Sequence, residues 1–292
     1  MLFILKIIFF VCFCNYSVGL RSNEIDRRPH PSPTPYHDWD YLVFSQRWSI
    51  TSCVDWKNKN SNHTCNLPTV NDKWIIHGIW PTKRGTEGPV FCPSAVHFDP
   101  TLLQPFLNDL DEQWTNVEAG TKEYSFWSHE WDKHGTCSID LPQLNSIPNF
   151  FMKGLELNKK YNLLEYLSTS KITPGKLGYT VQQIEEAIKS ATNHEPKIEC
   201  IVDSHTKEPL ISEIQICLDK SFEVIDCERG RDNSTIISDC SLKKSIMYLD
   251  TVSENEIYYQ MDYSNDNTDD ADNSASLYEL YKFIKLLIRF SL

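Results

Sequence analysis

The stretch that says most about this chain spans residues 126–137 and reads Phe126-Trp127-Ser128-His129-Glu130-Trp131-Asp132-Lys133-His134-Gly135-Thr136-Cys137. Glu130 and His134 are four residues apart, so both side chains lie on one face if the segment is helical. His129 and Lys133 have the same spacing. The aromatic rings of the stretch supply a hydrophobic anchor and stacking surfaces beside these polar groups. The stretch therefore predicts a helix whose charged surface suits a phosphate group and its proton transfers.

Two other interpretations of the stretch are open. In a zinc-protease helix the two histidines stand at positions i and i+4, whereas His129 and His134 would lie about 140° apart around a helix that turns ~100° per residue. They could not easily share one ion, so we expect no metal site. In the second interpretation His129 is simply exposed to solvent, and Glu130 forms a surface ion pair with Lys133 that contributes about 0.5 kcal/mol.

A second motif reads Trp74-Ile75-Ile76-His77-Gly78-Ile79-Trp80-Pro81-Thr82 and places one histidine beside an apolar run. Residues 74–77 have the composition of a β-strand, and we expect Gly78 and Pro81 to end it. A lone histidine at the end of a strand is more often a hydrogen-bonded structural residue than a catalyst. With the first stretch, it gives the chain two motifs that carry histidines.

The pattern between the two ends predicts one α+β domain over residues 36–249, with helices in the middle of the chain and strands on both sides. Asp99 and Pro100 are expected to start a helix that continues to Trp114. Further helices are expected over residues 150–167 and after Thr180, which opens a capping-box pattern. The predicted strands cover residues 39–50, 74–77, 198–202, 211–218 and 222–227.

The N-terminal end has a composition of its own. Residues 1–19 contain an apolar run that closes with Ser17-Val18-Gly19, and they indicate a secretory signal peptide cut near Gly19. A signal anchor is the alternative, although the run is shorter than the about 20 residues that a bilayer span needs. Residues 20–35 then form a proline-rich lead-in.

Residues 250–292 form a C-terminal tail. The part up to residue 279 carries nine acidic side chains and no basic one, which indicates a solvated segment. The last residues, 278–292, are apolar with Lys282, Lys285 and Arg289 among them. We expect this end to dock on the body or on a partner surface, because the three charges interrupt the hydrophobic tail that a lipid-anchor signal needs.

The net charge limits the classes of partner. The 292 residues include 40 acidic and 28 basic side chains, which give a formal charge of -12. Such a balance argues against a protein that coats nucleic acid through a broad basic face. An enzyme that binds a few nucleotides in a pocket is not excluded by it.

The cysteine usage fits the secretory route. Eight of the ten cysteines lie outside the predicted signal peptide, and an even number in a secreted protein favours disulfides over metal ligation. Their spacing alone leaves the pairing open. Asn62 and Asn233 begin glycosylation sequons, which we expect on surface loops.

Taken together, the two histidine motifs resemble the two active-site signatures of the T2-type ribonucleases. The first signature is matched by His77-Gly78-Ile79-Trp80-Pro81 and the second by residues 126–137. The resemblance extends from about Trp39 to Cys240 and takes in Gln46-Arg47-Trp48 and the segment from Glu213 to Asp219. It implies an α+β fold in which helices flank a central antiparallel sheet. It also implies the disulfides Cys53–Cys65, Cys92–Cys137, Cys200–Cys240 and Cys217–Cys227.

The resemblance further implies a secreted endoribonuclease that needs no metal or other cofactor. In this reaction the ribose 2′-hydroxyl attacks the adjacent phosphorus, a 2′,3′-cyclic phosphate forms, and DNA is no substrate because it lacks the nucleophile. His134 would be the general base and His77 the general acid. Glu130 and Lys133 would steady the pentacoordinate phosphate, and His129 would contact it, although Glu130 could instead join the proton transfers.

Base binding in this family uses aromatic faces, which makes Trp80 a candidate for one nucleobase site and Phe126 for the other. Simple core packing is the alternative for Phe126. Thr82 departs from relatives that have an aspartate there to read the base. Its presence indicates loose base selection on single-stranded RNA.

A rival to catalysis is a secreted glycoprotein of the same fold that acts by binding or signalling. No catalytic position of the two motifs is substituted, which favours the enzyme. We expect an extracellular protein, or one in a lysosome-like compartment, without stable membrane insertion, and a monomer.

Overall fold

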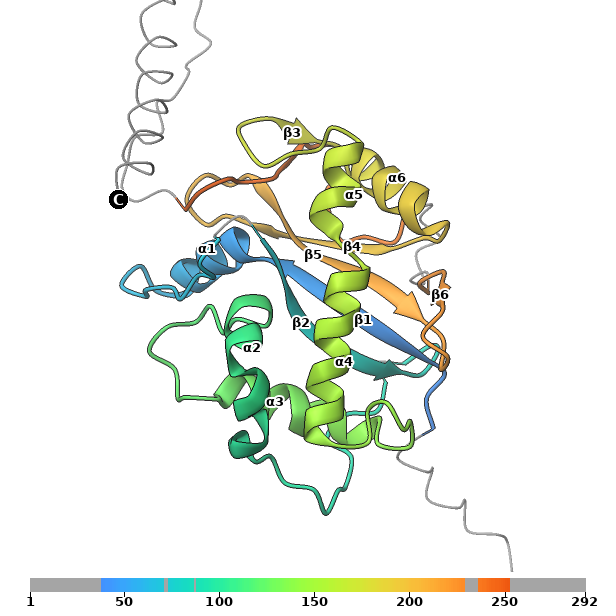
Figure 1. Cartoon of the computed structure of the whole chain (residues 1–292). Coiled ribbons are helices and arrows are strands. Elements are labelled where there is room, and N and C mark those ends of the chain that lie inside the picture. Colours follow the sequence, from blue (N-terminus) through green and yellow to red (C-terminus); the bar gives the residue numbers. More distant parts are fainter. Residues whose placement is uncertain (1–37, 71–72, 87, 229–235, 253–292) are drawn as a thin grey trace, which may run out of the picture. The chain divides into compact units, whose positions relative to one another are not determined.

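The computed structural model describes residues 38–70, 73–86, 88–228 and 236–252 (Figure 1). The predicted signal peptide, the lead-in, the Asn233 sequon and all but the first residues of the acidic tail lie outside these ranges, and they stay predictions. Within the described ranges, no helix is both long enough and apolar enough to span a bilayer.

A mostly antiparallel sheet of seven strands forms the centre of the described residues, in the order β2-β1-β5-β7-β3, with β4 and β6 also paired to β5. Only the pairing of β5 with β7 is parallel among the described strands. The strands are β1 (Tyr41–Trp48), β2 (Trp74–Thr82), β3 (Gly178–Tyr179), β4 (Lys197–Val202), β5 (Pro209–Leu218), β6 (Val224–Ile225) and β7 (Ile246–Met247). The predicted α+β class with a central antiparallel sheet is confirmed.

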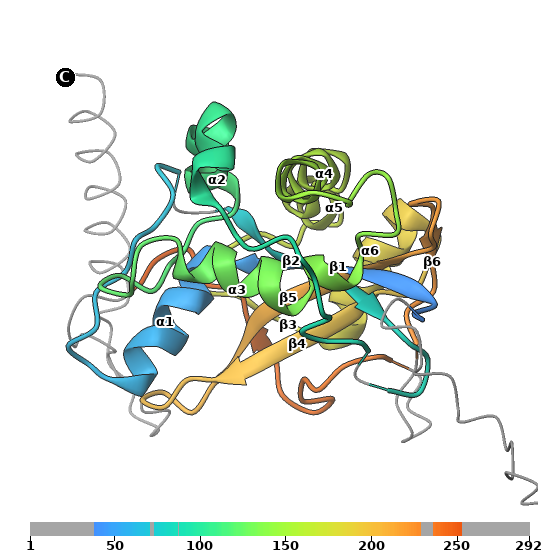
Figure 2. The same cartoon turned by 90° about the horizontal axis from the view of Figure 1, so that it is seen from below.

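Helices flank this sheet. Figure 1 shows α4 and α5 crossing one face of it, and Figure 2 places α2 with α4 on that side. The helices are α1 (Ser49–Lys59), α2 (Leu107–Gln113), α3 (Ser125–Lys133), α4 (Ile147–Lys160), α5 (Leu163–Thr169) and α6 (Val181–Thr192), with 3-10 turns η1 (Pro100–Phe106) and η2 (Gly135–Cys137).

Local capping signals predict some helix starts correctly. The side chain of Thr180 accepts a hydrogen bond from the backbone N–H of Gln183, and the side-chain oxygen of Gln183 accepts one from the backbone N–H of Thr180, so the predicted capping box opens α6. Asp99 accepts from the backbone N–H of Thr101 at 2.9 Å and caps the turn that begins at Pro100. That turn is 3-10 as far as Phe106, because Pro105 lies inside it and lacks the N–H that an α-helix requires there.

Other predicted boundaries are wrong. The helix predicted over residues 150–167 is two helices, because Asn162 caps a new one by accepting from the N–H of Glu165. The strand predicted to reach Ile50 ends at Trp48, and α1 starts at Ser49. Of the strand predicted over residues 222–227, only Val224–Ile225 is regular, because Phe222 has a left-handed backbone at the turn before it.

β2 is longer than predicted and continues through Gly78 and Pro81 to Thr82. Among the described strands β2 pairs with β1 alone, so it is an edge strand, where the missing N–H of proline is tolerated. Gly78 has no room for a side chain, because a Cβ there would overlap the Glu130 carboxylate and the Trp80 indole. Both residues that were expected to stop the strand therefore lie inside it.

Four disulfides tie the sheet and its loops together: Cys53–Cys65, Cys92–Cys137, Cys200–Cys240 and Cys217–Cys227. These are the pairings that the family resemblance implies. Cys92–Cys137 joins the loop after β2 to the turn that follows α3, so it links the two histidine motifs.

The core between the sheet and the helices is built on aromatic side chains. Trp114, which follows α2, is fully buried against Phe150 and Phe151 of α4. Gly154, one turn further along α4, lies against the same indole, and a Cβ at this position would overlap the ring. Close approach of α4 to Trp114 therefore requires glycine.

We predict that Gly154→Ala lowers the free energy of unfolding by about 1–3 kcal/mol, because the added methyl overpacks the core. Helix propensity alone would predict a gain of about 1 kcal/mol. Urea denaturation of the two proteins measures the difference. As a control, Ser190→Ala on the exposed side of α6 should change the stability by less than about 0.5 kcal/mol. A variant at Gly154 as stable as the parent would contradict the packing described.

Candidate active site

A β-bulge in β2 sets the position of His77. Gln46 of β1 pairs with Ile76 of β2, and the preceding Ser45 pairs with Gly78. His77 therefore has no partner residue on β1. Such an extra residue re-aims the side chains around it. The backbone at the bulge is held by Trp114, whose indole Nε1 donates to the carbonyl oxygen of His77 at 2.9 Å.

The bulge brings His77 and Trp80 to the same side of the strand although they are three residues apart. Their ring centroids are 5.0 Å apart with the rings nearly perpendicular. The His134 ring lies 5.3 Å from the same indole. Both imidazoles therefore contact one tryptophan, and the two histidine motifs meet in space.

Helix α3 carries most of the stretch 126–137 and packs it against the sheet. Trp127 and Trp131 are buried, and the indole Nε1 of Trp127 donates to the carbonyl of Trp114 at 2.8 Å. Phe126 and Glu130 belong to the side of α3 that faces β2, and His134 ends the helix with its backbone N–H on the carbonyl of Glu130 at 3.1 Å. The predicted grouping of Glu130 with His134 is thus present.

Glu130 is a buried carboxylate rather than a surface group. Its side chain is 2% exposed. Oε2 accepts a hydrogen bond from Trp80 Nε1 at 3.0 Å, and Oε1 lies 3.9 Å from Nε2 of His77. Burial raises the pKa of Glu130 above its ordinary value, although the neighbouring His77 and the Trp80 hydrogen bond oppose the shift. The alternative of a surface ion pair with Lys133 is therefore wrong.

His77 has a second carboxylate partner. Its Nδ1 lies 2.7 Å from Oε1 of Glu213 on β5. Burial disfavours the imidazolium, but the carboxylates of Glu213 and Glu130 outweigh burial and raise the pKa of His77 above 6.5. Glu213 was not assigned a role from the sequence. Its signals were its place in the segment that matches the family and a carboxylate within an alternating apolar strand, where a buried charge has to be paired.

His134 lies in the opposite electrostatic situation. The residue is 8% exposed, and its Nδ1 is buried without a hydrogen-bond partner among the described residues. Burial, followed by the positive charge of Lys133, lowers the pKa of His134 to about 2. The free protein therefore holds His134 neutral.

His129 and Lys133 border the site. His129 is exposed, and Lys133 is half-buried. The ring of His129 lies 6.1 Å from Phe91, and the backbone N–H of Phe91 donates to the carbonyl of Lys133 at 2.9 Å. Both side chains are close enough to His134 to lower the pKa of its ring, and the exposed position of His129 agrees with part of the second interpretation of the stretch.

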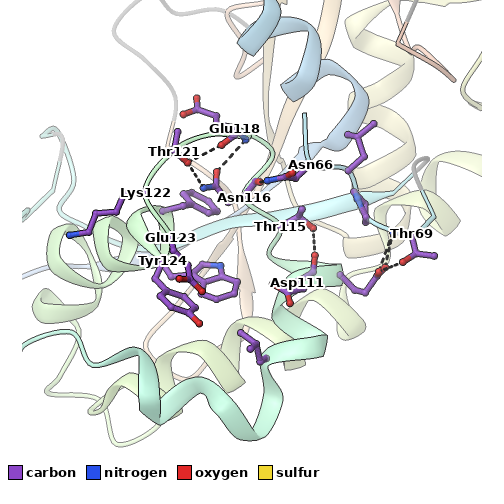
Figure 3. Close-up of a pocket in the computed structure, with 16 residues that line it drawn as sticks. Asn66, Thr69, Asp111, Thr115, Asn116, Glu118, Thr121, Lys122, Glu123 and Tyr124 are labelled. Carbon is purple, nitrogen blue, oxygen red and sulfur yellow. Dashed lines mark hydrogen bonds between the residues drawn. The ribbon is translucent and has the colours of Figure 1, made fainter. Parts of the chain in front are cut away.

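Phe126 connects the site to a neighbouring cavity. Its ring lies 6.0 Å from His77, and the guanidinium of Arg47 stacks on it at 4.5 Å. The same residue lines a cavity of about 560 Å³, shown in Figure 3. Other lining residues are Trp127, Tyr124, Leu67, Asn116, Glu118 and Lys122. Phe126 is therefore only partly core, and it stands at the border between the histidines and this cavity.

Asn62 begins a sequon on an exposed turn. Across the described ranges, no three His, Cys, Asp or Glu side chains converge as they would around a metal ion.

Comparisons with known proteins agree with this geometry. The model of the ribonuclease T2 family matches residues 39–227. Ribonuclease Oy of Magallana gigas is 36% identical over 214 residues, which cover 72% of this chain and 96% of that protein. RNase NT, solved in complex with 5′-AMP, aligns with a TM-score of 0.59 at 29% identity over 73% of this chain and 98% of that chain. Human RNase T2 aligns with a TM-score of 0.55 at 29% identity over 65% and 90% of the two chains.

We predict that the neutral, buried His134 makes the protein less stable in acid. The unfolded chain binds a proton near pH 6.5, whereas the folded protein binds it only near pH 2. The contribution of this group to the free energy of unfolding is therefore highest above pH 6.5. As the pH falls below 6.5, this one group lowers the free energy of unfolding by up to about 1.4 kcal/mol per pH unit. His134→Phe should therefore show a shallower loss of unfolding free energy between pH 6.5 and pH 4.

Urea titrations at several pH values measure this slope. The control is His205→Phe, whose side chain is 73% exposed and which should keep the slope of the parent protein. If His134→Phe loses unfolding free energy with falling pH as steeply as the parent protein, the prediction is contradicted.

Proposed function

The chain belongs to the ribonuclease T2 family and is an endoribonuclease of the T2 type, and from this premise we propose that it cleaves single-stranded RNA without a metal, through a 2′,3′-cyclic phosphate. The observation that carries the proposal is the pair of imidazoles on Trp80, whose pKa values are shifted in opposite directions. One ring is disposed to hold a proton and the other to accept one. General acid–base catalysis needs this division of roles.

His134 is the general base in this proposal. It is neutral in the free protein, and it removes the proton of the ribose 2′-hydroxyl as the oxygen attacks the adjacent phosphorus. A bound phosphate brings negative charge beside the ring, which raises the proton affinity of an imidazole. The acceptor is therefore strengthened by the substrate itself.

His77 is the general acid. Nδ1 faces Glu213, so Nε2 is the nitrogen that gives its proton to the departing 5′-oxygen. The bond from phosphorus to that oxygen breaks, and the bond from phosphorus to the 2′-oxygen forms, so the number of phosphorus–oxygen bonds is conserved. His77 ends neutral and His134 ends protonated, and proton exchange with water resets both.

Three further side chains act on the phosphate. Lys133 and His129 supply positive charge and hydrogen bonds to its oxygens. Glu130 steadies the pentacoordinate phosphorus from its buried place beside His77 and Trp80, where burial raises the pKa of its carboxyl group. Its position 3.9 Å from His77 Nε2 also fits the alternative in which it joins the proton transfers.

Two aromatic side chains are proposed to bind bases. Trp80 borders both imidazoles, and Phe126 borders the cavity beside them. Stacking on such rings tolerates every base. Thr82 donates its hydroxyl to the carbonyl of Trp80 at 3.1 Å, so it does not replace the base-reading carboxylate of some relatives. Low base specificity is therefore part of the proposal.

Secretion of the protein is also part of the proposal. Four disulfides are typical of oxidising compartments, and the exposed Asn62 can take a glycan there. A monomer is the expected state, with single-stranded RNA as the partner and no DNA cleavage.

We predict that the purified protein degrades single-stranded RNA in the presence of EDTA and leaves 2′,3′-cyclic phosphate ends, which phosphorus NMR detects. His77→Phe and His134→Phe should each lower the rate at least ~10²-fold, since each removes one proton-transfer group. His205→Phe serves as the control for an unrelated histidine. RNA binding without cleavage by the parent protein would support the rival binding role instead.

We predict that Phe126→Ala lowers kcat/KM for a dinucleotide by about 5- to 100-fold, because it removes stacking worth ~1–3 kcal/mol per base. Steady-state kinetics on dinucleotides that differ in one base measure this effect. The exposed Leu102→Ala is the matched control. If the variant at Phe126 matches the parent on every dinucleotide, the ring is core packing only.

A further inference from the structure

Glu213 stands at an interior position of the sheet, where a carboxylate is costly. It lies on β5 between β1 and β4, directly opposite Arg47 on one side and Glu199 on the other. Its side chain is 14% exposed. Burial of a charged group lowers stability unless the charge is paired and hydrogen-bonded. A carboxylate kept at this place therefore needs specific partners.

Each carboxylate oxygen of Glu213 has its own partner. Oε1 lies 2.7 Å from Nδ1 of His77 on β2, and Oε2 accepts the hydroxyl of Ser45 on β1 at 2.6 Å. The three side chains come from three adjacent strands, whose backbone ladders fix them relative to one another. The carboxylate is thus held by the sheet and cannot turn away from His77 without losing a hydrogen bond.

The orientation of the imidazole follows from this contact. An ionised carboxylate only accepts hydrogen bonds, so Nδ1 of His77 must carry its hydrogen. The other ring nitrogen, Nε2, then points towards Oε1 of Glu130 on α3, at 3.9 Å. Nδ1 is hydrogen-bonded to Glu213 of the sheet, and Nε2 is left to exchange a proton with the substrate.

The surrounding charges keep the Glu213 carboxylate ionised. Burial acts against the charge, but the imidazolium of His77, the two hydrogen bonds and the guanidinium of Arg47 together lower the pKa of Glu213. The other charged groups that act on the pair are Arg47 on β1 and, at His77, Glu130 on α3, whereas Glu199 on β4 is opposite Glu213 in the strand register. Of the described charged side chains around His77, Glu213 is the one that is hydrogen-bonded to its ring.

We propose that Glu213, braced by Ser45, is the positioning residue that orients His77 as the general acid and keeps its Nε2 proton directed at the leaving 5′-oxygen. The proposal rests on the proposed function of His77. His134 offers the contrast within the same site, because its Nδ1 has no partner in the described residues. A ring that donates a proton is fixed by a carboxylate, and a ring that accepts one is left neutral.

Substrates with different leaving groups distinguish a positioning role of Glu213 from a role in the stability of the fold alone. A dinucleoside monophosphate releases a 5′-alkoxide that needs a proton, whereas a nucleoside 3′-(4-nitrophenyl phosphate) releases a stabilised phenolate that does not. We expect Glu213→Gln to lower kcat on the dinucleotide by about 10- to 100-fold, as for other residues that orient a functional histidine. On the nitrophenyl ester the same variant should stay within about threefold of the parent enzyme.

Three further variants complete the experiment. His77→Ala should show the same dependence on the leaving group, with a larger loss on the dinucleotide. Ser45→Ala should show it with a smaller loss, and it serves as the second variant if Glu213→Gln does not fold. Glu199→Gln is the matched control, because it removes a carboxylate directly opposite Glu213 and should change neither rate.

The pH profile gives an independent measurement. Glu213 raises the pKa of His77, so its replacement by glutamine should move the limb on which activity falls with rising pH to lower pH. Nitrogen-15 NMR of labelled histidines should also show loss of the single Nδ1–H form of the His77 ring. A displaced limb and a mixed tautomer support the positioning role.

Two results overturn the inference. Equal losses on both substrates would mean that Glu213 only supports the fold, and an unchanged rate on the dinucleotide would mean that it has no role. Failure of the proposed function is distinguishable, because His77→Ala would then lose activity equally on both substrates.

Discussion

The hydrogen bond from Trp80 to Glu130 joins the sheet to helix α3, and the rest of the site depends on it. It is 3.0 Å long, and its acceptor is almost completely buried. Both histidine rings contact the indole that it fixes, His77 nearly perpendicular to it and His134 tilted against it. The contact is possible because Gly78 carries no side chain that would separate the two partners. A strand, a helix and a glycine thus combine to bring residues from distant parts of the chain to one site.

The two histidines owe their different chemistry to their surroundings rather than to their type. His77 lies between two carboxylates, and His134 is buried beside Lys133. Burial alone would favour the neutral form of both rings. The carboxylates reverse this tendency at one ring only, so the pKa values of the two imidazoles shift in opposite directions within one site.

Much of this arrangement is readable from the sequence where the signals are local. The capping residues of α6 and the α+β pattern depend on neighbours a few residues apart, and the two histidine motifs are continuous. The β-bulge at His77, the passage of β2 through Pro81 and the pairing of Glu213 with His77 depend on strands that meet only in the folded sheet. Residue spacing along the chain does not encode such contacts. The same reason explains why Arg47 appeared only as part of a matched segment, although its guanidinium stacks on Phe126.

Trp114 connects the hydrophobic core to the reacting groups. Its six-membered ring meets Gly154 of α4 at Cζ3, and its Nε1 donates to the carbonyl oxygen of His77. A shift of α4 is therefore transmitted through one rigid indole to the bulge. Substitutions that loosen the packing around Trp114 should therefore lower the turnover rate before they cause measurable unfolding. Selection for a high turnover rate then also constrains core residues that lie far from the site.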